Sequence, residues 1–288
     1  GPRPSTGACG KWESEFGVME KRDVRAAAKA LVAPVRATGH LSDVAAPGAA
    51  VHLAYPFESL GVAAYEAEAR AALARAFPDL ERRVTIEIAG QDDAGQLWVG
   101  QAGYWCGDFR APFLGIPPTR RMAAMRFHDF FRVADGAVQE MQSLWDIPEL
   151  MLQARVWPMV PSLGRDWQVP GPATQDGLSV SGDGAPARAV VGAMLDGLAR
   201  SREGVAAMGL ERYWHPACSW YGPAGIGTTR GIAGFRAHHQ APFLAAMPDR
   251  RALMENGHFF AEGAYVGFTA WPGMEMTLSG GGWLGLPA

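Results

Sequence analysis

Two neighbouring segments of the sequence carry the side chains best suited to acid/base chemistry. Residues 120–136 alternate polar and apolar side chains, and a tight turn leads into a second β-rich run at 137–147. In such a hairpin, residues whose numbers sum to about 270 oppose each other. This geometry sets His128 opposite Gln142, with Asp146 farther along the same face. The face then offers a base for the α-proton of a carbonyl compound and donors for the enolate oxygen.

Asp146 is the predicted general base, because Trp145 and Tyr104 would partly remove its carboxylate from water and raise its pKa. A structural role is the alternative. An aspartate before Ile-Pro is a good N-cap for the helix predicted at 147–153, and proline suits the first turn of a helix. His128 has a comparable alternative, since a lone strand histidine is often a hydrogen-bonded structural group.

Large aromatic side chains recur on the predicted strands of both halves. Trp98, Tyr104 and Trp105 lie in the first half, and Tyr265 and Trp271 lie at similar places in the second. Aromatics at strand spacing are usually core residues, but a pocket lined by some of them suits a flat, apolar or aromatic ligand. The predicted substrate-binding residues are Tyr104, Trp105, Gln142, Trp145, His258 and Trp271.

No motif in the sequence predicts a metal or a cofactor. His238 and His239 are adjacent on a predicted helix and point about 100° apart, and no third ligand has matching spacing. The loop at 222–231 (GPAGIGTTRG) lacks both the spacing and the strand–helix unit of a dinucleotide site. No nucleophile elbow, zincin or Walker motif occurs. His258, on a strand before a glutamate–glycine turn, is better explained as a binding residue.

The composition excludes several classes of partner. The formal net charge of −3 provides no broad basic surface, so nucleic acid is not expected. No run of 18 apolar residues predicts a membrane span, and the first twenty residues do not make a signal peptide. The three cysteines, Cys9, Cys106 and Cys218, are far apart and lack metal or redox spacing. These features favour a reduced, cytoplasmic location.

The order of predicted elements indicates an α+β fold. Helical patterns at 22–38 and 62–76 come first. Four β-rich runs then follow, at 81–90, 96–107, 120–136 and 137–147, separated by glycine or Asp-Gly turns. Helices followed by an antiparallel sheet are typical of α+β layers rather than of alternating βαβ units.

The sequence also repeats at a fixed offset. Residues 60–83 align without gaps on 230–253, an offset of 170, which pairs Gly61 with Gly231. The same offset returns when FLGIPP at 113–118 meets WLGLPA at 283–288. Similarity by chance between two amphipathic helices is the alternative. A repeat of this length predicts two copies of one domain.

Composition places the boundaries between these copies. A proline- and glycine-rich stretch without an apolar period favours a linker or a strap over the surface. In the second copy, helices are predicted at 186–209 and 231–246 and strands at 251–260 and 264–271. The predicted organisation is an N-terminal extension at 1–21, a first domain at 22–156, a linker at 157–186 and an incomplete second domain at 187–288.

The motifs of the first copy resemble those of the SnoaL-like polyketide cyclases, within the nuclear-transport-factor and ketosteroid-isomerase fold group. The resemblance rests on the Leu-Gly-x-Pro turn at 113–118, the strand from Asp129 to Arg132, the Asp-Gly hairpin and the final Trp145–Asp146 pair. It covers about 22–155 fully and about 187–288 incompletely.

This resemblance implies two tandem cone-shaped α+β barrels, each a curved antiparallel sheet wrapped against helices around one pocket. Members with known chemistry use a pocket carboxylate, often with a histidine, for cofactor-free acid/base catalysis of an intramolecular aldol closure. The resemblance adds Asp129 to Asp146 and His128 as catalytic candidates. Asp129 and Arg132 lie on opposite faces of a regular strand, so one of the two is expected to be structural.

The predicted function is a cofactor-independent acid/base enzyme of the cyclase, isomerase or lyase type, acting on a small apolar, polyketide-like carbonyl compound. The alternative is a non-catalytic small-molecule-binding or assembly module of the same fold. A second copy that stops at Ala288 would leave an unpaired sheet edge. We therefore expect a homodimer or an intramolecular pseudo-dimer.

Overall fold

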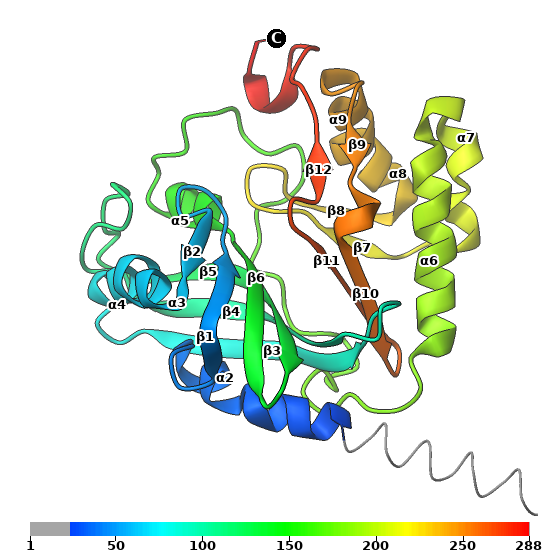
Figure 1. Cartoon of the computed structure of the whole chain (residues 1–288). Coiled ribbons are helices and arrows are strands. Elements are labelled where there is room, and N and C mark those ends of the chain that lie inside the picture. Colours follow the sequence, from blue (N-terminus) through cyan, green and yellow to red (C-terminus); the bar gives the residue numbers. More distant parts are fainter. Residues whose placement is uncertain (1–23, 288) are drawn as a thin grey trace, which may run out of the picture.

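The computed structural model describes residues 24–287, so the predicted extension at 1–21 lies outside the described residues. Its centre is a curled six-stranded sheet in the order β2-β1-β6-β5-β4-β3 (Figure 1). All neighbours are antiparallel except β1 and β6, which run parallel. The strands are β1 (Ala45–His52), β2 (Ser59–Gly61), β3 (Glu81–Gln91), β4 (Leu97–Asp108), β5 (Met122–Ala134) and β6 (Ala137–Trp145).

The hairpin between β5 and β6 has a different register from the one the sequence predicted. Asp135 and Gly136 both have positive φ, 51° and 70°, which fits the expected two-residue turn. An irregularity beyond Val133 then adds one residue on the β6 side. Because the turn pairs Ala134 with Ala137 and the irregularity shifts the register by one more residue, Phe130 rather than His128 opposes Gln142, and His128 opposes Leu144.

Helices cover one face of the sheet, and the main core lies between the two layers (Figure 1). Alanine-rich segments form α2 (Ala33–Thr38), α3 (Val62–Ala64), the π-helical turn η1 (Tyr65–Arg70) and α4 (Ala71–Ala76). Tyr65, Ala69 and Leu73 are buried at helical spacing against this face. The last helix of the first half, α5 (Ile147–Gln153), follows β6 directly. The predicted α+β fold is thereby confirmed.

The second half contains shorter elements. Its strands form three two-stranded ladders within the described residues rather than one curled sheet, so the tandem barrel stays a prediction. The predicted helix at 186–209 is interrupted at Gly204, where φ is 102°. The elements are α6 (Ala185–Ala199), η2 (Arg200–Glu203), α7 (Val205–Met208), η3 (Leu210–Arg212), β7 (Ser219–Tyr221), β8 (Thr228–Arg230), α8 (Gly231–Phe235), η4 (Arg236–Gln240), α9 (Ala241–Ala246), β9 (Arg251–Ala252), η5 (Met254–Asn256), β10 (Gly257–Glu262), β11 (Tyr265–Ala270), β12 (Met274–Glu275) and η6 (Trp283–Gly285).

Backbone features nevertheless recur at the sequence offset. The β1–β2 hairpin leads into a helical run with the π-helical turn η1 inside it, and the β7–β8 hairpin leads into a run containing the π-helical turn η4. Leu114 and Gly115 have φ of 50° and 79°, and their counterparts Leu284 and Gly285 have 53° and 79°. Related local sequences thus adopt related local conformations in the two halves.

The second half packs on the outer face of the sheet, opposite the helices of the first half. Figure 1 shows β10 and β11 between the sheet and α6. Phe260 of β10 is fully buried and belongs to a small core with Ile88 and Trp98 of the sheet. The linker also follows the sheet: the amide of Glu87 donates to the carbonyl of Gly177 at 2.8 Å. Among the described helices, none is long and apolar enough to cross a membrane.

Candidate active site

A row of polar side chains crosses the interior of the sheet on the face that the helices cover. Glu87, Gln101, Asp129 and Ser143 are successive cross-strand partners on β3, β4, β5 and β6. Each is at most 2% exposed. Buried polar groups are costly unless they are paired, so their partners define what this row can do. We call these four residues the interior polar row.

Asp129 is the most strongly held member of the row. One carboxylate oxygen accepts from Arg82 Nη2 at 2.6 Å, and the other accepts from Ser143 Oγ at 2.5 Å. The Arg82 guanidinium also lies over the Phe127 ring, 4.1 Å from its centroid. Burial raises the pKa of the Asp129 carboxyl, while Arg82 and Ser143 oppose the rise. A desolvated carboxylate of this kind is a stronger proton acceptor than one in water.

The other end of the row carries a second acid–base pair. Gln101 Nε2 donates to Glu87 Oε2 at 2.6 Å, and Arg36 Nη1 donates to Glu87 Oε1 at 3.1 Å. Arg36 extends from α2, so the helix layer closes this end of the interior. Two arginines therefore balance the two buried carboxylates of the row.

Four buried polar atoms beside the row have no hydrogen-bond partner among the described residues. They are Trp105 Nε1, Trp145 Nε1, Gln101 Oε1 and Arg82 Nε. The two indoles meet edge to face, with centroids 5.9 Å apart. Buried donors and acceptors rarely remain unpaired, so these atoms are available to hydrogen-bond a polar group inside the sheet.

All of these features lie in one segment of the chain, and that segment matches a known protein family. Residues 26–154 match the family model of the SnoaL-like polyketide cyclases. The resemblance predicted from the sequence is thereby confirmed, and we call this stretch the SnoaL-like domain. It contains all six strands of the main sheet and the whole interior polar row.

Solved structures with similar folds cover about half of the chain. IdmH from Streptomyces antibioticus is 22% identical over 44% of this chain and 95% of its own, with a TM-score of 0.37. TsrD from Streptomyces laurentii is 20% identical over 46% and 97%, with a TM-score of 0.38. A phenazine biosynthesis-related protein from Pseudomonas aeruginosa is 15% identical over 53% and 99%, with a TM-score of 0.37. No curated protein matches the chain significantly.

The structure distributes the predicted site residues over three places. Asp129, Trp105 and Trp145 lie in the interior of the SnoaL-like domain. His128 lies on the outer face and is exposed. The sequence analysis did not single out Arg82, Gln101 or Ser143. Strand alternation could have identified two of them, because residues an even number of positions apart point to the same face of a strand. Gln101 thus shares a face with Trp105, and Ser143 shares one with Trp145.

Gln142, His258 and Trp271 lie where the second half contacts the outer face of the SnoaL-like domain. Thr269 Oγ1 donates to Gln142 Oε1 at 2.8 Å. His258 Nδ1 lies 2.8 Å from Asp92 Oδ2, and its ring lies 4.3 Å from that of Trp98. Trp271 stacks on His52, with centroids 5.6 Å apart. All three side chains therefore contribute to the contact between the two halves.

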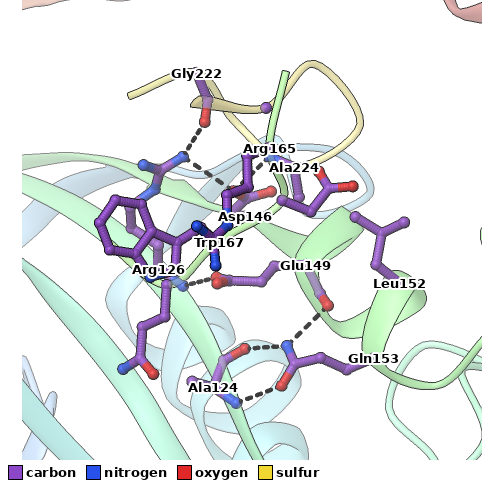
Figure 2. A pocket seen from close by; sticks show the side chains of 13 residues that line it. Ala124, Arg126, Asp146, Glu149, Leu152, Gln153, Arg165, Trp167, Gly222 and Ala224 are labelled. Carbon is purple, nitrogen blue, oxygen red and sulfur yellow. Dashed lines mark hydrogen bonds and ion pairs between the residues drawn. The ribbon is translucent and has the colours of Figure 1, made fainter. Parts of the chain in front are cut away.

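Asp146 lies at a separate pocket outside the interior (Figure 2). Its side chain makes no cap hydrogen bond to α5. Instead, Asp146 Oδ2 accepts from Arg126 Nη2 at 3.3 Å and from the amide of Ala224 at 2.9 Å. Tyr104 lies on the same outer face, and its hydroxyl donates a hydrogen bond to the carbonyl of Val169 in the linker. We call this site the junction pocket.

Glu149 in the junction pocket is expected to titrate near neutral pH. Burial raises its pKa from 4.5 to about 7; the amide of Arg126 opposes this rise and the Asp146 carboxylate adds to it. The stability that this group contributes is present at low pH and is lost as the pH rises through about 7. Between pH 4.5 and about 7, the free energy of unfolding should therefore decline less steeply in Glu149→Gln than in the wild-type protein. Denaturation at a series of pH values measures this slope. An unchanged slope would contradict the assignment.

No three histidine, cysteine, aspartate or glutamate side chains in the described part of the chain gather closely enough to hold a metal ion. His239, which the sequence analysis considered, instead stacks on Trp220 with centroids 4.2 Å apart. Burial lowers its pKa to about 4, so it remains neutral at physiological pH.

Proposed function

We propose that the SnoaL-like domain is an acid/base enzyme of the cyclase or isomerase type that acts on a small apolar carbonyl compound. The observation that supports this most is the buried Asp129 carboxylate in the same interior as two indole N–H groups that have no partner among residues 24–287. A base next to donors is the arrangement that enolisation requires. The aromatic wall of Trp105, Trp145 and Phe127 favours a flat, apolar substrate.

The proposed reaction needs no cofactor. Asp129 accepts a proton from the carbon next to the carbonyl, and the electron pair moves onto the carbonyl oxygen. The N–H groups of Trp105 and Trp145 donate hydrogen bonds to that enolate oxygen. The enolate carbon then attacks a second carbonyl of the same molecule in a ring closure, or recovers a proton in an isomerisation. In the ring closure, Asp129 returns its proton to the new alkoxide.

A non-catalytic binding module is the second candidate. Both oxygens of Asp129 already accept hydrogen bonds, from Arg82 and Ser143. An acceptor that is fully engaged is a weaker base until a substrate displaces one donor. Proton exchange from a ketone distinguishes the two functions, because a binding module would hold the ketone without exchanging its α-protons.

The test follows deuterium incorporation at the α-carbon of 1-tetralone in D2O by NMR. The variant is Arg82→Met/Asp129→Leu, which removes both charges together and so avoids an unpaired buried ion. We expect exchange above the buffer rate in the wild-type protein and a loss of at least about 100-fold in the variant. Glu140→Gln is the matched control, because Glu140 lies on β6 but pairs with Arg132 instead of joining the row.

Equal exchange in the wild-type protein and the double variant would refute Asp129 as the base. Loss of exchange in Asp146→Asn alone would move the chemistry to the junction pocket. Binding of 1-tetralone without any exchange would support the binding module.

We also propose that residues 187–288 are a partial copy of the SnoaL-like domain and that the two form an intramolecular pseudo-dimer. The shared offset, the paired π-helical turns and the matching φ values of the Leu-Gly turns support this. The linker at 157–186 would then hold the copy against the outer face. This contact would cover the apolar surface of the sheet around Trp98.

A further inference from the structure

The junction pocket lies where three separate segments of the chain meet. Its volume is about 240 Å³. The SnoaL-like domain supplies the start of β5, Asp146 and one side of α5, the linker supplies residues 165–168, and the second half supplies the β7–β8 turn. Figure 2 shows Arg126, Asp146 and Glu149 beside the loop that carries Gly222 and Ala224. A cavity of this size suits a small ligand rather than a polycyclic one.

The free polar atoms in the floor of the pocket are acceptors. Asp146 Oδ1 is buried and has no partner among the described residues, and the side chain is only 7% exposed. Glu149 Oε2 accepts from the amide of Arg126 at 2.6 Å, while its other oxygen accepts no hydrogen bond from the part of the chain that the structure describes. A buried carboxylate oxygen without a donor is costly, so a ligand at this site should bring N–H groups.

The donors in the floor are already engaged. Arg126 donates to Asp146, to the carbonyl of Gly222 at 2.7 Å and to the carbonyl of Tyr221 at 3.4 Å. Gln153 exchanges two hydrogen bonds with the backbone of Ala124. Both donor side chains of the floor, Arg126 and Gln153, are therefore already bonded to groups within the described residues, which disfavours an anion there.

The rim offers the opposite charge. Arg165 is exposed, and its guanidinium lies 5.2 Å from the centroid of the Trp167 ring. Arg165 forms no ion pair with an acidic residue within the described chain. Asp166 also lines the pocket, and its Oδ1 already accepts from Ser162 Oγ and from the amide of Gly225. The pocket thus presents the carboxylates of Asp146 and Glu149 in its floor, the Arg165 guanidinium and the engaged Asp166 carboxylate at its opening, and apolar surface from Leu152, Ala124 and Trp167.

We propose that the junction pocket binds a small zwitterion with the charge pattern of a free amino acid. The ammonium group of the ligand donates to Asp146 Oδ1 and Glu149, and its carboxylate faces Arg165. A short aliphatic side chain packs on Leu152 and Trp167. This binding site is distinct from the interior polar row and does not depend on the proposed catalysis.

The test is isothermal titration of the full chain with three related probes. L-Leucine carries both charges, 3-methylbutylamine lacks the carboxylate, and 4-methylpentanoate lacks the ammonium. We expect leucine to bind most tightly, the amine to bind less tightly and the acid not to bind. Asp146→Asn and Glu149→Gln should each weaken leucine binding at least about tenfold, because each removes an acceptor for a charged donor. Arg165→Ala should weaken it about two- to fivefold, as expected for an exposed ion pair.

Glu203→Gln is the matched control, because Glu203 forms an exposed pair with Arg200 and does not line the pocket. Circular dichroism checks that each variant folds. If Asp146→Asn does not fold, Glu149→Gln still tests the role of the carboxylates. Absence of leucine binding to the wild-type protein would overturn the proposal. Equal affinities for leucine and 3-methylbutylamine, unaffected by Arg165→Ala, would overturn the zwitterion and leave a site for a simple cation. Binding of 4-methylpentanoate as tight as that of leucine would overturn the role of the two carboxylates.

Discussion

Asp129→Asn is expected to lower the free energy of unfolding by about 3–5 kcal/mol, because it leaves the Arg82 guanidinium buried without its counter-ion. The side chains of Arg82 and Asp129 are 0% and 1% exposed, so water cannot replace the lost carboxylate. The amide that replaces it can still accept one hydrogen bond but carries no charge. Chemical denaturation followed by tryptophan fluorescence measures the loss.

The double variant Arg82→Met/Asp129→Leu provides the control for this prediction. It removes both charges and fills the space with apolar side chains, so its stability should lie close to that of the wild-type protein. A double-mutant cycle then gives the coupling between the two residues. If Asp129→Asn were as stable as the wild-type protein, the ion pair would not be formed in solution as described.

Phe260→Ala is expected to release the β10–β11 hairpin from the SnoaL-like domain at a cost of about 3–5 kcal/mol. Phe260 is fully buried, and it lies edge to face with Phe130 at a centroid distance of 6.1 Å. A Cβ at Gly267 would meet the Phe260 ring at 2.7 Å, so glycine at this position allows the ring to pack closely. Hydrogen exchange measured by mass spectrometry should show faster exchange across 257–270.

Phe268→Ala is the matched control on the same hairpin. Phe268 lies on β11 but is 38% exposed, so its truncation should change stability and exchange much less. Equal protection of 257–270 in Phe260→Ala and in the wild-type protein would contradict the pseudo-dimer, because the hairpin would then be held by something other than this contact.

The fold of the first half could be predicted because its local signals agree. The helical segments, the β-rich runs and the Asp135–Gly136 turn all indicate one α+β layer, and the Leu-Gly-x-Pro turn adds the family. Register was harder to predict. The turn pairs Ala134 with Ala137, one residue away from the expected register, and one extra residue between Val138 and Glu140 adds a second step. Together they shift the partner of Gln142 from His128 to Phe130, and bulges of this kind leave no clear mark in a single sequence.

The site was predictable only in part, for a geometric reason. Alternation along β5 separates Asp129 from His128, but it does not say which face the helices cover. The sequence places the predicted pocket on the face of His128, Gln142 and Asp146. In the structure this face packs against the linker and the second half or meets solvent. The junction pocket joins segments that are far apart in sequence, such as Asp146 and Ala224, which are separated by 78 residues, and no local pattern reports such a contact.

The central claim is that the interior of the SnoaL-like domain, lined by Trp105 and Trp145, holds an apolar carbonyl ligand. The chain contains ten tryptophans, and each gives one indole N–H signal in a nitrogen–proton correlation spectrum. Titration with 1-tetralone shows which of these signals shift. The variants Trp105→Phe and Trp145→Phe assign the signals of Trp105 and Trp145, because each variant lacks one of them. We expect the Trp105 and Trp145 signals to shift together with ligand concentration. If both remained unchanged while the signal of Trp167 moved, the ligand would lie in the junction pocket and the claim would be wrong.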